Sequence, residues 1–198
     1  MLDNLQDLTD IDVIQFILDG NVDAFSVLLK RYQRYVFSIT YKYVAPDHVE
    51  EISHEVFISA FKSLKNFSGK SDFKFWLAKI TVRRCYDYLR KKYRRKEQAV
   101  DFLDRKDEHW VDKMKLAQND AYKREADRRE LREMLNWSLN RLPPQDRMVL
   151  QSVYIDGLSL KETAELLDIT VMNVKVRSFR AKRKLKKILS EVLDDELR

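Results

Sequence analysis

The sequence is poor in the residues that interrupt helices, and it has a single cysteine. Three glycines and three prolines occur in 198 residues, and breakers this sparse favour an almost entirely helical chain. Gly20, Gly69 and Gly157 stand where periodic apolar segments end, and Pro143–Pro144 marks a further boundary. The lone Cys85 excludes an internal disulfide and argues against a cysteine-based metal site. It fits a reducing, cytosolic setting.

Other absences narrow the possible functions. His48, His54 and His109 are too scattered to form a ligand cluster, so we expect no metal and no cofactor. No apolar run approaches the roughly 20 residues that span a bilayer. The N-terminus lacks the cationic start and apolar core of a signal peptide. The sequence therefore predicts a cytoplasmic protein.

Apolar periodicity predicts an all-α protein of two small helical domains joined by a flexible acidic linker. We expect the domains at residues 1–96 and 128–198 and the linker at residues 97–127. Between Glu97 and Asp112 there are six acids and two bases, and apolar residues are sparse, as is typical of a linker. Four amphipathic segments fill the first domain. They begin near residues 10, 21, 46 and 71, the last with Ser71 as its expected cap.

A first basic segment, residues 79–96, mixes cations with tyrosines. The net charge of the chain is only +6, but this segment alone holds nine Lys or Arg and a single acid, Asp87. Cations follow the phosphate backbone and aromatic faces stack on unpaired bases, so the pattern favours single-stranded DNA. The alternative is a solvated basic face with core aromatics. For Phe75 and Trp76, just upstream, a place in the core is the favoured interpretation.

A second basic segment covers residues 170–187, and residues 158–184 have the pattern of a helix-turn-helix. A short helix opens with a capping-box pattern at Ser159–Glu162, and Thr170 can cap the longer helix that follows. The longer helix has one small or apolar face and an opposite face that suits base edges, with Arg for guanine and Asn for adenine. A solvated basic face is the alternative. The inward residues are Val174, Ser178, Ala181 and Leu185; the base-reading residues are Asn173, Val176, Arg177 and Arg180; and Lys175, Lys182, Arg183, Lys186 and Lys187 suit phosphates.

Glu51 and Glu55 lie four residues apart, so they share one helical face. Paired carboxylates can serve acid–base catalysis, but no nucleophile, glycine-rich phosphate loop or metal-ligand set accompanies them. A protein-docking face or an ordinary solvated face is therefore favoured over a catalytic one.

With these motifs in this order, the chain resembles the extracytoplasmic-function sigma factors of bacterial RNA polymerase, of the sigma-70 family, across nearly its full length. HVEEISHEVFISAF at residues 48–61 is similar to the acidic segment that docks on the polymerase clamp. FKFWLAKITVRRCYDYLRKKYRR at residues 73–95 is similar to the promoter-melting and minus-ten segment. Residues 139–187 resemble the minus-thirty-five domain. The resemblance implies an alternative sigma factor, not an enzyme, that binds core polymerase and directs promoter-specific initiation.

The resemblance also implies partners and residue roles. The partners are core RNA polymerase, through its clamp and flap, and promoter DNA in duplex and single-stranded form. An anti-sigma factor is left open, and neither a small-molecule substrate nor homo-oligomers are expected. The implied polymerase-binding residues are Glu51, His54, Glu55 and Phe57. The implied minus-ten residues are Asn66, Phe67, Ser68, Lys70, Trp76, Lys79, Arg83, Arg84, Asp87 and Arg90. The implied minus-thirty-five residues are Asn173, Lys175, Val176, Arg177, Arg180, Lys182 and Arg183.

The sequence departs from the family's usual residues at three positions. His54 stands where Gln is usual, Arg83 where Asn is usual, and Asp168 where the turn of the helix-turn-helix usually has Gly. Because Asp tolerates a left-handed backbone less easily than Gly, we expect a slightly different turn. By its charge, the linker is expected to thread the positively charged nucleic-acid path of the polymerase.

Two other functions remain as alternatives. A stand-alone helix-turn-helix regulator would be favoured by a dimer on a palindromic site, and the asymmetry of the two basic segments argues against it. A nuclease needs a carboxylate or histidine cluster for metal or proton transfer, and the sequence offers none.

Overall fold

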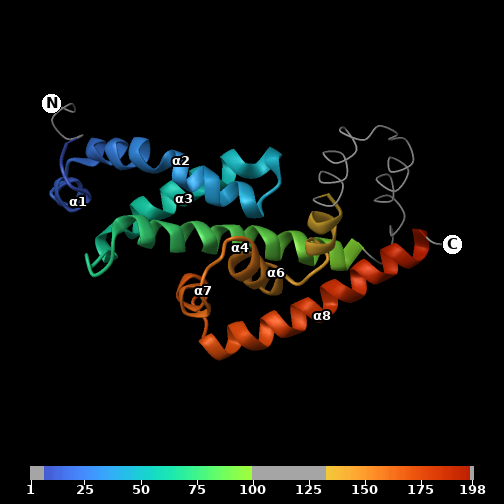
Figure 1. The fold of residues 1–198 in the computed structure, drawn as a ribbon. Helices are drawn as coiled ribbons and strands as arrows, with labels where there is room; N and C mark the ends of the chain where they lie inside the picture. The colour runs from blue at the N-terminus through green and yellow to red at the C-terminus, as the bar shows by residue number, and fades with distance from the viewer. Residues whose placement is uncertain (1–6, 100–132, 197–198) are drawn as a thin grey trace, which may run out of the picture. The chain divides into compact units, whose positions relative to one another are not determined.

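A computed structural model describes residues 7–99 and 133–196, with side chains described for residues 7–95 and 133–191. Within these ranges every regular element is helical (Figure 1), so the predicted all-α class is confirmed. The chain divides into two compact units. The α-helices are α1 (Asp10–Leu18), α2 (Phe25–Tyr43), α3 (Val49–Ser63), α4 (Phe73–Ala99), α6 (Pro144–Leu150), α7 (Leu160–Leu167) and α8 (Val171–Glu196). Residues 133–139 are also helical. The shorter elements are η2 (Val22–Ala24), η3 (Pro46–His48), η4 (Leu64–Asn66) and the π-helical η6 (Gln151–Ile155).

The first unit holds one apolar core, to which each of α1, α2, α3 and α4 contributes. Val13, Leu28, Val56 and Leu77, one from each helix, are at most 1% exposed. Complete burial of an aliphatic side chain of this size contributes about 1.5–3 kcal/mol. These contacts fix which faces of α3 and α4 are turned outward. Cys85 of α4 is also fully buried, and it is not part of a disulfide.

The start of α1 is fastened to α2 by a polar cluster. Thr9 and Asp12 form a capping box, in which the Asp12 amide donates to Thr9 Oγ1 at 3.3 Å and the Thr9 amide donates to Asp12 Oδ2 at 3.3 Å. Asp10 accepts hydrogen bonds from Arg31 and Tyr32 of α2. Burial, followed by the hydrogen bond to Asp10, raises the pKa of Tyr32 above its ordinary value.

The predicted breaks in the first unit are confirmed, with two corrections at α4. Gly20 and Gly69 have φ of 107° and 68°, a backbone region that favours glycine. The expected cap at Ser71 is wrong, because α4 begins at Phe73 and the carbonyl of Asp72 accepts from the amides of its first turn. The helix also runs on to Ala99, past the expected start of the linker at residue 97. The rest of the expected linker, residues 100–127, lies outside the described residues.

The second unit has its own core, to which residues 133–142, α6 and α8 contribute. Leu139, Leu142, Leu150 and Ala181 form one buried cluster. Helical spacing in the sequence predicts one apolar face on the first helix, with Leu131, Leu135, Leu139 and Leu142, and this is only partly right because Leu135 is 36% exposed. Met134 and Ser138 are buried on that helix instead, and Leu131 lies outside the described residues.

The helix-turn-helix has the predicted caps. The Ser159 amide donates to Glu162 Oε2 at 2.8 Å, and the Glu162 amide donates to Ser159 Oγ at 3.2 Å. This hydrogen bonding lowers the pKa of Glu162 below its ordinary value. Thr170 caps α8 by accepting from the Asn173 amide at 3.1 Å. Between the two helices, Asp168 has φ of 54°, so an aspartate adopts the left-handed conformation in the turn.

Candidate nucleic-acid interfaces and docking groove

Helix α8 is divided into a buried face and an exposed face. Val174 and Ala181 are fully buried, Ser178 is 6% exposed and Leu185 packs against the core. All four predicted inward residues are therefore confirmed. The division is what a helix of 3.6 residues per turn produces when its apolar positions recur every third or fourth residue.

The exposed face of α8 carries a line of apolar residues, of which only Val176 was among the expected site residues. Met172, Val176 and Phe179 are 68%, 38% and 65% exposed. Their spacing of i, i+4 and i+7 places them along one side of the helix, opposite Val174 and Ala181. We call these three residues the apolar stripe. Exposed cations adjoin it, namely Lys175, Arg180, Lys182 and Arg183.

Arg177, an expected base-reading residue, is directed elsewhere. Its Nη1 donates to Oδ1 of Asp146 in α6 at 2.8 Å, and the two side chains are 32% and 9% exposed. The guanidinium is thus engaged inside the unit, whereas Asn173, Val176 and Arg180 are exposed as expected. The pairing joins residues 31 positions apart, so no local sequence pattern indicates it.

Lys182, an expected phosphate contact, rests on an aromatic ring. Its Nζ lies 4.0 Å from the ring centroid of Tyr154 in η6, a distance at which a cation is attracted to an aromatic face. A hydrogen bond with Lys182 lowers the pKa of the Tyr154 hydroxyl. The contact restricts where this cation can be placed.

Helix α4 presents a cationic face with an aromatic residue in it. Lys79, Arg83 and Arg90 are exposed and Tyr86 is half-buried. Their spacing of i, i+4, i+7 and i+11 puts them on one side of the helix. Three expected minus-ten residues therefore share a face with Tyr86, which was not among the expected site residues. Asp87, half-buried, follows Tyr86 directly.

The segment before α4 is anchored by aromatic packing. The ring of Phe67 lies 5.7 Å from that of Phe73 and 5.3 Å from that of Trp76, measured between centroids. Trp76 packs against the core of the first unit, as favoured from the sequence. The remaining expected residues of this segment, Asn66, Ser68 and Lys70, are exposed.

Arg84 connects α4 to α3. Its Nε donates to the Ser59 hydroxyl at 2.9 Å, and the side chain is half-buried. Of the expected minus-ten residues on α4, Arg84 is thus positioned by a contact within the first unit.

The acidic face of α3 is exposed. Glu51, His54 and Glu55 point to solvent, and Nδ1 of His48 lies 3.2 Å from Oε2 of Glu51. Phe57, which was grouped with them, is only 6% exposed and belongs to the core of the first unit.

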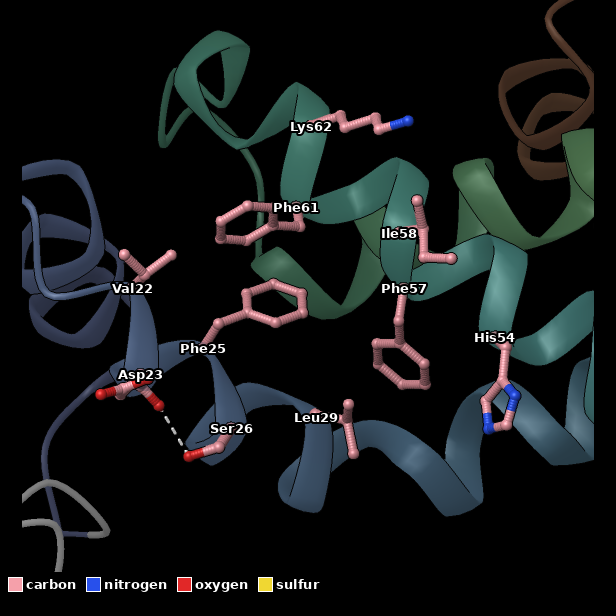
Figure 2. A pocket seen from close by; sticks show the side chains of 10 residues that line it. All are labelled: Val22, Asp23, Phe25, Ser26, Leu29, His54, Phe57, Ile58, Phe61 and Lys62. Atoms are coloured by element: carbon pink, nitrogen blue, oxygen red, sulfur yellow. Dashed lines mark hydrogen bonds between the residues drawn. The ribbon is translucent and has the colours of Figure 1, made fainter.

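Next to this acidic face lies an open, mainly apolar groove of about 640 Å³ between η2, α2 and α3 (Figure 2). The rings of Phe25 and Phe61 meet edge to face across it, with centroids 5.1 Å apart. Ile58 is 54% exposed at its margin, and His54 belongs to both the groove and the acidic face. The lining residues are Val22, Asp23, Phe25, Ser26, Leu29, His54, Phe57, Ile58, Phe61 and Lys62.

Two kinds of feature are absent from the described residues. In residues 7–99 and 133–196, no three His, Cys, Asp or Glu side chains come together as metal ligands. Within the same ranges, no helix has the length and apolar character to span a membrane.

Comparison with known proteins identifies similar sequences over both units. Residues 28–95 match the family described as sigma-70 region 2, and residues 132–185 match sigma-70 region 4. The ECF RNA polymerase sigma-E factor of Escherichia coli (strain K12) is 32% identical over 178 residues, which cover 89% of this chain and 92% of that protein. The protein of the same name from Haemophilus influenzae is 29% identical over 177 residues, with 89% and 93% covered.

Two solved structures share the fold. One is CnrH in complex with the cytosolic domain of CnrY, with a TM-score of 0.52, 22% identity, and 92% of this chain and 97% of that chain covered. The other is the sigma factor RpoE in complex with the anti-sigma factor NepR from Bartonella quintana, with a TM-score of 0.51, 17% identity, and 84% and 96% covered.

Proposed function

This chain belongs to the extracytoplasmic-function sigma factors of the sigma-70 family and directs transcription initiation as an alternative sigma factor, and we propose how its surfaces divide that task. The observation that carries the proposal is that α4 and α8 each present a cationic face, with different uncharged residues between the cations. Residues 1–96 form the polymerase-binding and minus-ten domain, and residues 128–198 form the minus-thirty-five domain.

The face of α4 binds the melted minus-ten strand. Lys79, Arg83 and Arg90 follow the phosphate backbone, and the half-buried Tyr86 between them offers a ring to unpaired bases. At the start of the helix, the exposed Asn66–Lys70 segment captures a base that leaves the stack. The packing of Phe67 on Trp76 holds this segment in place before DNA binds.

Helix α8 reads the minus-thirty-five duplex. Its first turns enter the major groove, as the second helix of a helix-turn-helix does. Asn173 and Arg180 are exposed and reach base edges, while Lys175, Lys182 and Arg183 contact phosphates. Arg177 supports this face from within, through its hydrogen bond to Asp146.

The acidic face of α3 and the adjoining groove bind core polymerase. Glu51 and Glu55 attract a basic surface of the clamp, and the apolar groove accommodates its uncharged side chains. Such a pairing of an apolar patch with a charged rim is usual at protein interfaces. The second unit contacts the polymerase flap, as the family resemblance implies.

Further partners follow from the family and the fold. A chain with the fold of RpoE, which was solved with the anti-sigma factor NepR, is expected to have an anti-sigma partner of its own. The protein acts in the cytoplasm, where polymerase and promoter DNA are found. It acts as an initiation factor and not as an enzyme.

In vitro transcription with core polymerase, the purified chain and a randomised promoter library tests the proposal. We expect defined starts that depend on the chain and share two upstream elements. A preparation that binds DNA but gives no chain-dependent start would instead support a stand-alone regulator. Cleavage of the library DNA by the chain would support a nuclease.

A further inference from the structure

The apolar stripe on α8 occupies the part of the helix that the proposed function places in the major groove. Met172, Val176 and Phe179 lie opposite the buried Val174 and Ala181, so they form the centre of the outward face. Asn173 and Arg180 stand at its side. The most central side chains of the reading surface are therefore apolar.

Apolar side chains at this place need an apolar partner. In the major groove, the 5-methyl group of thymine is the apolar feature of the base edges, and side chains such as Phe make contact with it. From Met172 to Phe179 the helix rises about 10 Å. That length corresponds to about three base-pair steps of about 3.4 Å, so one stripe can meet methyl groups on neighbouring pairs.

The surroundings of the stripe favour DNA over a protein partner. Lys175, Arg180 and Arg183 are exposed beside it, and Lys182 is held on the ring of Tyr154. A cationic rim complements two phosphate strands on either side of a groove. The rim around the groove of the first unit is acidic at Glu51 and Glu55, as suits a basic protein surface.

We propose that Met172, Val176 and Phe179 recognise thymine methyl groups in the minus-thirty-five duplex, and this proposal rests on the proposed function of α8. The upstream element then holds a run of adjacent or alternating thymines on the strand or strands facing the stripe. Recognition there depends on methyl contact as well as on hydrogen bonding from Asn173 and Arg180.

Replacement of thymine by deoxyuridine tests this directly, because deoxyuridine pairs identically and lacks only the methyl group. The probes are duplexes selected by the holoenzyme from the randomised library, each with one upstream thymine replaced. For the wild-type holoenzyme, we expect each replacement at two or three positions to weaken binding about fourfold, the effect of one buried methyl group. The three single variants are Met172→Ala, Val176→Ala and Phe179→Ala. We expect each to bind the thymine probe more weakly than wild type does, and to lose little further affinity when deoxyuridine replaces the thymine that the removed side chain contacts.

Two control variants accompany the test. Ile155 is 55% exposed and lies in η6, outside the stripe, so Ile155→Ala should keep the wild-type response to methyl removal. Lys175→Ala should weaken thymine and deoxyuridine probes equally, because a phosphate contact does not sense the base. Thermal unfolding of every variant shows whether the fold is retained.

Several results would overturn the proposal. One is a selected upstream element without thymines. Another is chain-dependent initiation with equal binding of thymine and deoxyuridine probes, which leaves the proposed function intact. If the stripe variants lost affinity for core polymerase but kept the full methyl dependence, the stripe would be a protein contact. Absence of any chain-dependent start would instead overturn the proposed function itself.

Discussion

Arg177 in α8 donates a hydrogen bond to Asp146 in α6, with 2.8 Å between Nη1 and Oδ1. The carboxylate is 9% exposed and the guanidinium side chain 32%. An ion pair in this position holds the orientation of α8 relative to α6 and limits what Arg177 can offer to DNA. The chemistry of the arginine, taken alone, suggested base recognition.

The Asp146–Arg177 pair should contribute to stability. Asp146→Ala removes the acceptor and leaves the guanidinium without this partner, so we expect a loss of about 1.5–3 kcal/mol in the free energy of unfolding. Denaturant unfolding of the full chain measures it. Glu165→Ala removes an exposed carboxylate from α7 and should have little effect. Equal stability of the two variants would show that the pair adds nothing.

The turn of the helix-turn-helix should be strained by its aspartate. Asp168 has φ of 54°, and Gly adopts this conformation without a steric penalty from Cβ. We expect Asp168→Gly to stabilise the chain by about 1 kcal/mol. Asp168→Ala should destabilise it, because Ala lacks the short polar side chain that helps Asp adopt this conformation. Differential scanning calorimetry measures both variants, and a stability order of Ala above Gly would contradict the argument.

The acidic face of α3 should matter for polymerase and not for stability. Glu51→Lys is expected to weaken binding to core polymerase at least about tenfold through like-charge repulsion. Glu50→Lys is the matched control, since both residues are exposed in the first turn of α3 and both lose the same interaction with the helix dipole. Their side chains differ by about 100° around the helix. Fluorescence anisotropy with labelled chain gives the affinities for core polymerase. Equal losses of affinity in the two variants would show that α3 does not carry the proposed docking face.

The capping box of α7 should make stability depend on pH in the acid range. Its hydrogen bonds lower the pKa of Glu162 below the ordinary 4.5, so the ionised form is favoured in the folded chain. This stabilisation is present above the unfolded pKa and is lost as the pH falls through the lower folded pKa. Glu162→Gln should therefore be less stable than wild type at pH 7, with the difference vanishing in acid. An unchanged difference from pH 7 to pH 3 would contradict this origin. In Ser159→Ala, NMR titration should return the Glu162 pKa toward its ordinary value.

Local patterns in the sequence predicted much of the fold. The spacing of apolar residues gave the helices of both units, and the polar residues at Ser159 and Thr170 gave two caps, because both signals act over three or four residues. The same spacing predicted the buried face of α8. At Ser71 and Leu135 the prediction failed, since helix ends and packing partners depend on tertiary contacts.

The candidate site was less accessible to sequence reasoning. Arg177 was expected to read bases, but its partner Asp146 lies 31 residues away in the chain. Met172 and Phe179 were not among the expected site residues, and their exposure is what places them on the outward face of α8. The sequence did contain a signal that these two residues face outward. Val174 and Ala181 already define an inward face, and Met172 and Phe179 fall on the other side of the helix.

The buried thiol of Cys85 gives this factor a built-in reporter. Because Cys85 is the one cysteine in the sequence and is 0% exposed in α4, a thiol reagent can modify the folded chain only when the first unit opens locally. The modification rate therefore measures the free energy of that opening when closing is faster than labelling. The same measurement in the presence of core polymerase would show how far the partner suppresses opening of the helix proposed to hold the melted strand.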